Sequence, residues 1–168
     1  MNKLFVLTGP AGVGKSTISL KIAESLEKSV LIEGDDIYHL VKGGYIPPWL
    51  PNKQFPLFWD NCLSIISNSL QNGYDVVFNY ILNKNDVKNI KDKFPDAEIK
   101  FIVLLVDEKT VMERDKLRPL DCQMGKRALV LLKKMQDEKF NNNNILNAST
   151  LTVEETYEEI LNNNRFLI

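Results

Sequence analysis

One stretch near the start of the chain, residues 9–16, constrains the fold more than any other feature of the sequence. It reads Gly-Pro-Ala-Gly-Val-Gly-Lys-Ser, follows the apolar run 3–8 directly, and leads into apolar Ile18, Ile22 and Leu26 at a spacing of four. A β-rich run, a glycine-rich turn and a helical spacing in succession predict a strand, a loop and a helix. The turn matches the pattern G-x-x-x-x-G-K-[ST], whose glycines let several backbone amides face one point. The sequence therefore predicts a phosphate-binding loop between the first strand and the first helix.

The residue types of this loop are those that a bound triphosphate requires. The N-terminus of the following helix adds its partial positive charge at the point that the amides face. We expect the Lys15 ammonium to contact the β- and γ-phosphates and the Ser16 hydroxyl to ligate Mg²⁺. A glycine-rich turn that binds nothing is the alternative, which the strand, loop and helix in register disfavour. The predicted ATP-binding residues of the loop are Gly9, Pro10, Ala11, Gly12, Val13, Gly14, Lys15, Ser16 and Thr17.

Short β-rich runs alternate with longer amphipathic stretches along the remaining chain. This alternation is typical of parallel strands that are connected by helices. The middle runs are almost continuous in Val, Ile, Leu and Phe, which indicates strands covered on both faces. A capping box, Thr152 with Glu155, predicts the start of the last helix. The expected strands are residues 3–8, 29–33, 75–79, 99–106 and 145–147.

Composition and charge exclude several classes of protein. A chain of 168 residues that is 44% hydrophobic suits one compact domain, and two cysteines with one histidine are too few for a disulfide scaffold or a four-ligand zinc site. We therefore expect a reduced, cytoplasmic protein, as a monomer or dimer. The formal net charge of −1 argues against binding nucleic acid through the overall field. The longest apolar run has six residues, against about 20 in a membrane-spanning helix, and the apolar start ends at Gly9, too early for a signal peptide.

Three carboxylates follow the second predicted strand. Residues 30–32 are Val-Leu-Ile and run into Glu33, Gly34, Asp35 and Asp36. We expect this strand to lie next to the first, so that the carboxylates sit at the edge where parallel sheets bind ligands. One carboxylate can accept the proton of an attacking hydroxyl, and another can hold Mg²⁺ directly or through water. The alternative is that Asp35 or Asp36 caps a helix that begins near residue 37.

The phosphate loop and this acidic turn together resemble the small-molecule P-loop kinases of the gluconate kinase, shikimate kinase and chloramphenicol phosphotransferase type. The resemblance implies an α/β protein with the three-layer α/β/α P-loop NTPase fold, a five-stranded parallel sheet and a short helical lid. It also implies transfer of the γ-phosphoryl group of Mg²⁺-ATP to a hydroxyl of a small polar molecule. Glu33 would support the metal, and Asp35 would bind substrate and act as base, with Asp36 second. Glu33 replaces the Asp of the family, and His39 falls one residue later than the histidine of gluconate kinases.

Three of the four arginines, Arg114, Arg118 and Arg127, fall within 14 residues. The planar guanidinium group binds phosphate oxygens in pairs, so this clustering indicates a segment that faces phosphate. Residues 114–127 resemble the lid of the same kinases and lead into a predicted helix over 126–140, with Arg114 and Arg118 as catalytic and ATP-binding residues. An exposed face of ion pairs is the alternative, with the arginines paired to Glu113, Asp115 and Asp121.

Residues 43–56 hold four prolines and cannot form a helix or a central strand. We expect an ordered loop that covers an acceptor pocket. Flat side chains with hydrogen-bonding edges would suit a neutral or singly charged molecule, because only Lys42 and Lys53 supply positive charge nearby. Core packing is the alternative for Trp49 and Trp59. The predicted substrate-binding residues are Asp35, Asp36, His39, Tyr45, Trp49, Trp59, Asn79 and Tyr80.

Three further patterns bear on the function. The apolar run 101–106 ends in Asp107 and Glu108, as in ATPases that polarise water, but we expect Asp107 to cap the helix that carries Arg114. Asn79 stands where many P-loop enzymes have a metal-supporting Asp, and its amide can hydrogen bond a hydroxyl or a metal-bound water. Four consecutive asparagines, residues 141–144, predict a surface turn. The rival functions are a nucleotide or polynucleotide kinase and an ATP-dependent switch without an acceptor.

Overall fold

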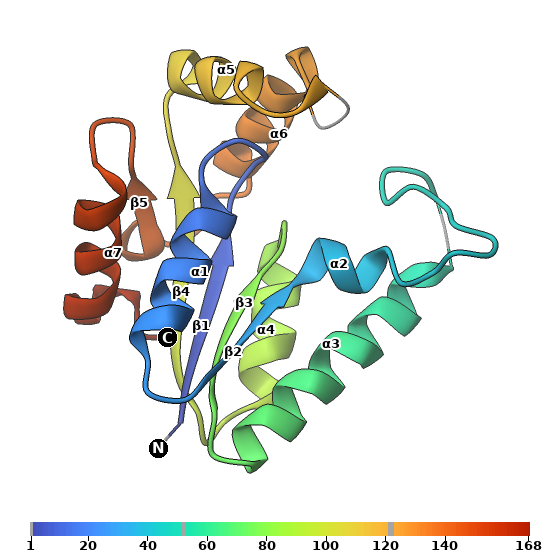
Figure 1. Cartoon of the computed structure of the whole chain (residues 1–168), viewed down its shortest axis with the longest axis vertical. Helices are drawn as coiled ribbons and strands as arrows, with labels where there is room; N and C mark the ends of the chain where they lie inside the picture. Colours follow the sequence, from blue (N-terminus) through green and yellow to red (C-terminus); the bar gives the residue numbers. More distant parts are fainter. Residues whose placement is uncertain (1, 52, 121–122) are drawn as a thin grey trace.

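A computed structural model describes residues 2–51, 53–120 and 123–168, which form a five-stranded sheet in the order β2-β3-β1-β4-β5 (Figure 1). Every pairing between these strands is parallel. The strands are β1 (Lys3–Thr8), β2 (Ser29–Glu33), β3 (Asp75–Asn79), β4 (Glu98–Leu105) and β5 (Ile145–Asn147). The helices are α1 (Lys15–Ser25), α2 (Gly34–Tyr38), α3 (Gln54–Gln71), α4 (Lys84–Lys93), α5 (Glu108–Lys116), α6 (Lys126–Asp137) and α7 (Val153–Asn162), with the 3₁₀ turns η2 (Asn142–Asn144) and η3 (Asn164–Phe166).

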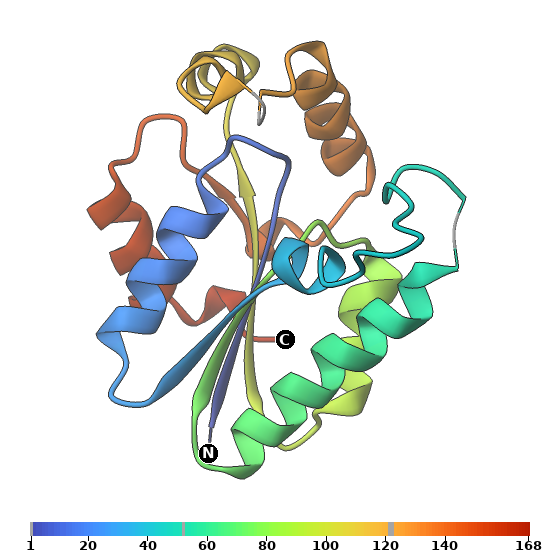
Figure 2. The same ribbon diagram turned by 45° about the vertical axis from the view of Figure 1, so that its right-hand side comes forward.

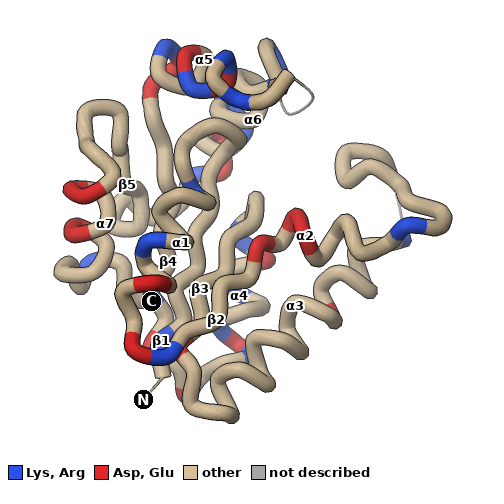
Figure 3. The backbone as a smooth tube through the Cα atoms, viewed as in Figure 1, with Lys and Arg blue, Asp and Glu red and all other residues tan. Residues whose placement is uncertain are grey.

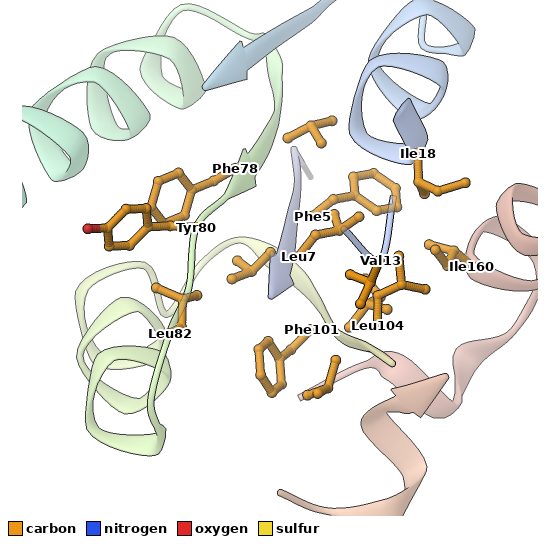
Figure 4. Close-up of a cluster of buried hydrophobic side chains, with 14 of the residues drawn as sticks. Phe5, Leu7, Val13, Ile18, Phe78, Tyr80, Leu82, Phe101, Leu104 and Ile160 are labelled. Atoms are coloured by element: carbon orange, nitrogen blue, oxygen red, sulfur yellow. The ribbon is translucent and has the colours of Figure 1, made fainter. Parts of the chain in front are cut away.

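Helices cover both faces of the sheet. α1 and α7 lie side by side on one face, α3 and α4 lie on the other, and α5 and α6 stand beyond the carboxyl ends of the strands (Figures 1 and 2). Figure 4 shows Phe5, Ile18 and Ile160 gathered on the α1 side, with Phe78 on the α3 side. The predicted three-layer α/β/α fold with a five-stranded parallel sheet is confirmed. No helix in the described part of the chain is both long and apolar enough to cross a membrane.

The place of β2 in the sheet differs from the expectation. β2 pairs with β3, where Glu33 lies opposite Asn79, and β3 in turn pairs with β1. The prediction that the second strand lies next to the first is therefore wrong. β3 is buried along almost its whole length and suits a central position, whereas four of the five residues of β2 are only partly buried, as is typical of an edge strand. Glu33 still reaches the carboxyl edge of the sheet, one strand farther from the phosphate loop.

The ends of three elements also differ from the predicted bounds. β4 begins and ends one residue earlier than the predicted run 99–106. α6 ends at Asp137 instead of residue 140, and the chain then turns through Lys139, which has a φ of 53°. Pro56 belongs to the first turn of α3 and not to the preceding loop, because the missing amide of a proline costs no hydrogen bond in the first turn of a helix.

The asparagine run is only partly a surface turn. Asn144 is buried, and its Nδ2 donates hydrogen bonds to the carbonyl oxygens of Phe101 (3.0 Å) and Phe166 (3.4 Å). The prediction is wrong for this residue, because its amide satisfies carbonyl groups of two segments that pack together. The predicted capping box is confirmed, since Thr152 and Glu155 each accept a hydrogen bond from the backbone amide of the other.

Candidate active site

The phosphate loop connects the carboxyl end of β1 to α1. Gly12 and Gly14 have φ values of 82° and 100°, a region open to glycine, and they curve the backbone into a concave turn. The Lys15 side chain bends back over this turn, and its Nζ donates to the carbonyl oxygens of Gly9 (2.9 Å) and Pro10 (3.0 Å). The ammonium group therefore lies at the N-terminus of α1, where helix geometry favours an anion.

Opposing charges act on this ammonium group. The pKa of Lys15 is lowered from 10.5 to about 8, because burial in the loop and the Arg118 guanidinium lower it more than the carboxylates of Asp35 and Glu33 raise it. Two acidic side chains, from the end of β2 and the start of α2, and one arginine from the turn after α5 therefore act on the charge of the same amine. A phosphate anion would favour the charged form of Lys15 in the same way as the carboxylates.

Ser16 and Glu33 supply a pair of oxygen atoms beside Lys15. The Ser16 Oγ donates to Glu33 Oε2 at 3.1 Å, which joins the first turn of α1 to the end of β2. A hydroxyl and a carboxylate are hard ligands of the kind that Mg²⁺ prefers. Within the described ranges, no three or more His, Cys, Asp or Glu side chains gather as a metal cage. The Ser16 and Glu33 oxygens fit the usual mode of Mg²⁺ binding, in which waters and substrate phosphates complete the shell.

The acidic turn forms the start of α2. This helix begins at Gly34, three residues before the expected position, and Asp35 and Asp36 occupy its first turn with exposed side chains. Figure 3 places this acidic segment at the carboxyl edge of the sheet. No side chain caps α2, so the alternative in which Asp35 or Asp36 serves as the N-cap is wrong. The N-cap position is Glu33, the last residue of β2, and its side chain makes no capping hydrogen bond.

Gly34 fixes the position of this turn through a close contact. A Cβ at residue 34 would lie 2.6 Å from Cδ2 of Tyr80, whose ring is buried against Phe58. We expect Gly34→Ala to displace this ring and to lower the free energy of unfolding by about 1–3 kcal/mol. Urea unfolding followed by circular dichroism measures the loss. Gly43→Ala is the matched control, because no atom lies within 4 Å of its Cβ, and an equal loss in both variants would contradict the role of the contact.

The two arginines that were predicted to bind ATP lie on α5 and the turn after it. Arg114 donates from Nη1 to the carbonyl oxygen of Val13 at 2.8 Å, so α5 rests directly on the phosphate loop. Arg118 forms an ion pair with Asp115 at 3.6 Å and also lowers the pKa of the loop lysine. One ion pair of the predicted alternative is therefore present. Asp121, named in the same alternative, lies outside the described residues.

Asp115 connects α5 to α6, the two helices that flank the predicted lid, residues 114–127. Its carboxylate is 2% exposed and accepts hydrogen bonds from the backbone amides of Met124 (3.0 Å) and Gly125 (2.7 Å). Burial alone would raise the pKa of Asp115, but these amides and the Arg118 guanidinium lower it on balance. The sequence predicts only a surface ion pair for Asp115, so this role is not visible in the sequence. A carboxylate that binds amides nine and ten residues away leaves no pattern in the sequence.

Asp107 is the N-cap of α5. Its carboxylate accepts a hydrogen bond from the amide of Thr110 at 2.7 Å, and this bond lowers the pKa of Asp107. The amide of Asp107 donates in turn to the Ser149 hydroxyl. The predicted capping role of Asp107 is confirmed, because its carboxylate binds the backbone at the start of α5.

Aromatic side chains order the loop between α2 and α3, residues 39–51 and 53. Tyr38 is buried, and its Oη donates to the carbonyl oxygen of Ile46 at 2.7 Å. The rings of His39 and Tyr45 stack with centroids 5.5 Å apart, and His39 Nε2 lies 3.2 Å from Tyr45 Oη. The amide of Ile46 also donates to Oε1 of Gln54 at the start of α3. The loop is therefore held at both ends by side-chain contacts, without regular secondary structure.

The two tryptophans have different surroundings. Trp49 is 59% exposed, and the guanidinium carbon of Arg127 lies 3.9 Å from the centroid of its ring. Trp59 is partly buried in α3 and packs edge-to-face against Phe78 of β3, as its core-packing alternative describes. Arg127 makes no ion pair with any residue in the described ranges, so the predicted surface ion pairs are not seen for it.

Asn79 presents a buried amide at the carboxyl end of β3. Phe78 points to the α3 face and packs on Trp59, so Asn79 points to the opposite face, which α1 covers. Asn79 is 4% exposed, and its Nδ2 has no hydrogen-bond partner among the residues described. A buried donor left unpaired costs about 1–3 kcal/mol, which a ligand oxygen at this point would offset. Tyr80, by contrast, packs into the core, where burial raises its pKa.

A cavity of about 220 Å³ opens between the phosphate loop and α7. Thr17 of α1 lines it together with Leu151 and Thr156 from the end of the chain. Leu151 and Thr156 are not predictable from the sequence, because only the fold brings the end of the chain beside α1. A larger cavity of about 430 Å³ lies near Asn2 and Phe94, at the amino ends of the strands and therefore away from the phosphate loop.

Comparisons with known proteins identify the fold. No protein-family model and no curated protein sequence matches the chain, whereas solved structures match it over nearly its whole length. A sugar kinase from Janibacter sp. aligns with a TM-score of 0.75 at 16% identity, covering 96% of this chain and 94% of that one. The chain has the P-loop kinase fold. The tunicamycin resistance protein of Deinococcus radiodurans aligns with a TM-score of 0.68 at 16% identity, covering 96% of this chain and 95% of that one. A gluconokinase from Sinorhizobium meliloti aligns with a TM-score of 0.66 at 21% identity, covering 95% of this chain and 90% of that one.

The P-loop kinase fold brings some of the predicted site residues together and leaves others apart. Lys15 lies among residues from the loop, the acidic turn and the lid, namely Ser16, Glu33, Asp35, Arg114 and Arg118. His39, Tyr45 and Trp49 belong to the loop between α2 and α3, which faces α6 across the carboxyl end of the sheet (Figure 2). Trp59 and Tyr80 pack mainly against other aromatic side chains.

Proposed function

We propose that this protein transfers the γ-phosphoryl group of ATP to a hydroxyl group of a small polar molecule. The observation that carries the proposal is the placement of Lys15 among carboxylates and an arginine at the carboxyl edge of the sheet. A lysine and an arginine stabilise the negative charge of a phosphoryl group in transfer. A nearby carboxylate can accept the proton of an attacking hydroxyl, which an ATP-dependent switch would not need.

Each residue of this group would have a separate task in the reaction. Lys15 would hold the β- and γ-phosphates, and Arg118 would balance charge on the group in transfer. Asp35 would accept the proton of the acceptor hydroxyl at a carboxylate oxygen. The bond between the acceptor oxygen and the γ-phosphorus forms as the bond from that phosphorus to the bridging oxygen breaks, and ADP leaves.

Ser16 and Glu33 would hold the Mg²⁺ that accompanies ATP. The Ser16 hydroxyl would ligate the metal, and Glu33, which already accepts a hydrogen bond from that hydroxyl, would orient it. Bound Mg²⁺ would neutralise charge on the phosphates. The unpaired Nδ2 of Asn79 on the same face of the sheet would donate to an oxygen of the bound substrates.

The nucleoside of ATP would enter the cavity between the phosphate loop and α7. This cavity adjoins Gly14 and Thr17, so a nucleotide with its phosphates on the loop reaches it directly. Its walls combine apolar side chains with the Thr156 hydroxyl, a lining that suits a flat base with polar edges.

The acceptor would bind on the other side of Lys15, between the acidic turn and the loop after α2. Asp35 and Asp36 are exposed there, and acidic side chains disfavour a strongly anionic acceptor. A neutral or singly charged hydroxyl compound is the class that these charges favour. The likeness to a sugar kinase and a gluconokinase supports an acceptor related to sugars.

An acceptor screen with ADP release as the readout tests the proposal. The panel contains sugars, sugar acids, shikimate-like rings, aminoglycosides, phenicol-type alcohols and nucleosides, each supplied with Mg²⁺-ATP. We expect ADP release to rise above the rate without acceptor for members of one compound class. The same low rate with every compound would contradict the proposal and favour a switch.

The affinity for ADP is expected to fall above pH 8. The pKa of Lys15 is about 8 in the free protein, and bound phosphates would raise it, so binding above that pH requires uptake of a proton. If only the ammonium form binds, the affinity at pH 9 is about tenfold lower than at pH 7. Isothermal titration with Mg²⁺-ADP measures this change. Lys15→Arg keeps its charge and should give a flat profile, and a wild-type profile that is equally flat would contradict the prediction.

A further inference from the structure

Trp49 and Arg127 form a contact between two segments that are otherwise separate. The guanidinium group lies 3.9 Å from the ring centroid, within the range of a cation–π interaction. Trp49 belongs to the loop after α2, and Arg127 to the first turn of α6. Figure 2 shows these two segments facing each other across the carboxyl end of the sheet. The ring is otherwise largely exposed, so core packing does not explain its position.

The loop side of this contact is connected to the acidic turn. The hydrogen bond from Tyr38 Oη to the carbonyl oxygen of Ile46 ties the loop to the last residue of α2. The stacked rings of His39 and Tyr45 join the first residue of the loop to the residue before Ile46. Trp49 therefore lies three residues from Ile46, which is joined to α2, and the first turn of α2 carries Asp35.

The lid side of the contact is connected to the phosphate loop. Gly125, two residues before Arg127, donates its amide to Asp115 at 2.7 Å. Asp115 follows Arg114 in α5, and Arg114 donates to the carbonyl oxygen of Val13 in the phosphate loop. Each link is a hydrogen bond or a covalent neighbour, so the position of Arg127 depends on how α5 rests on that loop.

We propose that Trp49 and Arg127 are positioning residues that set the acceptor side and the nucleotide side of the site together. Their contact closes a chain of links from Val13 through the lid and the loop to α2. Neither residue touches the phosphate loop, so both act through the elements that they join. The inference rests on the proposed function, because it assigns the two sides of the cleft to nucleotide and acceptor.

The expected strength of the contact is modest, because Trp49 is largely exposed. A cation–π pair at an exposed site shifts an equilibrium by about two- to fivefold. A buried cation–π pair would shift the same equilibrium further. Loss of either partner should therefore weaken, but not abolish, the binding of a nucleotide that needs the lid in place.

A fluorescence measurement tests whether the contact exists in solution. Trp59→Phe leaves Trp49 as the single tryptophan of the chain, because the sequence has two. In that background, Arg127→Met is expected to change the emission of Trp49. Lys126→Met is the matched control, since it removes a positive charge from the same turn of α6 and should leave the emission unchanged. Identical emission in all three proteins would overturn the inference.

A double-mutant cycle tests whether the contact couples to nucleotide binding. The probe is the non-hydrolysable ATP analogue AMP-PNP with Mg²⁺, and its affinity is measured by isothermal titration. We expect Trp49→Ala and Arg127→Met each to weaken binding about two- to fivefold, and the double variant to be no weaker than either. Trp49→Phe should restore most of the affinity, and Leu50→Ala, in the same loop, should have no effect.

The outcomes separate this inference from the proposed function. Unchanged affinity in the single variants, or losses that add in the double variant, would overturn the coupling while nucleotide binding stands. Failure of the unmodified protein to bind AMP-PNP would overturn the proposed function and the coupling together.

Discussion

Lys15→Met is expected to lower the rate of phosphoryl transfer by about a hundred- to a thousandfold. Lys15 is the ammonium group that lies in the phosphate loop, where it donates to the carbonyl oxygens of Gly9 and Pro10. Those neutral carbonyls can exchange for phosphate oxygens, which carry more charge and bind an ammonium group more strongly. Methionine retains the length of the side chain and removes the charge. Initial rates of ADP formation with the acceptor found in the screen measure the loss.

The same variant should remain folded. Burial lowers the pKa of Lys15, which means that the protein pays a cost to keep this ammonium group charged. Its removal is therefore not expected to lower the melting temperature. Lys28→Met is the control, because Lys28 is exposed in the segment between α1 and β2, and this variant should retain the full rate. A Lys15→Met protein that is folded and transfers phosphate at the normal rate would exclude Lys15 from the mechanism.

Asp35→Asn should lower the transfer rate by at least about a hundredfold while nucleotide affinity at pH 7 changes little. The Asp35 carboxylate lies close enough to Lys15 to favour its charged form, and the side chain is exposed to an incoming acceptor. Asparagine has nearly the same shape but cannot accept a proton. The loss should therefore appear in kcat rather than in the affinity for ATP.

Asp36→Asn is the matched comparison, because Asp36 is the next residue in the first turn of α2 and is equally exposed. We expect the larger loss in the Asp35 variant. A normal rate in Asp35→Asn with a large loss in Asp36→Asn would move the base to Asp36. Normal rates in both would remove the acidic turn from the chemistry.

Local sequence patterns predicted most of the fold. The glycine-rich loop between a β-rich run and a helical spacing defines β1, its loop and α1, because all three depend on neighbouring residues. The continuous apolar runs located the other strands to within one residue. The order of β2 and β3 could not be predicted in this way, because it depends on which strand buries both faces. The resemblance to small-molecule kinases agrees with the P-loop kinase fold of the chain.

The candidate site was predictable where its residues lie at the ends of strands. Glu33 and Asp35 follow an apolar run, and their proximity to Lys15 follows from the geometry of a parallel sheet. Asp115 and the contact between Trp49 and Arg127 were not predictable, since they join residues through tertiary structure alone. The sequence neighbours of Arg127 suggest ion pairs, whereas the ring that it contacts, Trp49, lies 78 residues earlier in the chain.

The central claim is that the γ-phosphoryl group leaves ATP for a small molecule rather than for water. The direct test measures ADP and the phosphorylated acceptor by mass spectrometry in the same reaction, with inorganic phosphate measured beside them. The account predicts one phosphorylated acceptor for each ADP formed, with both products formed at least about a hundredfold more slowly in Lys15→Met. ADP accompanied by an equal amount of inorganic phosphate, and no phosphorylated compound, would contradict it.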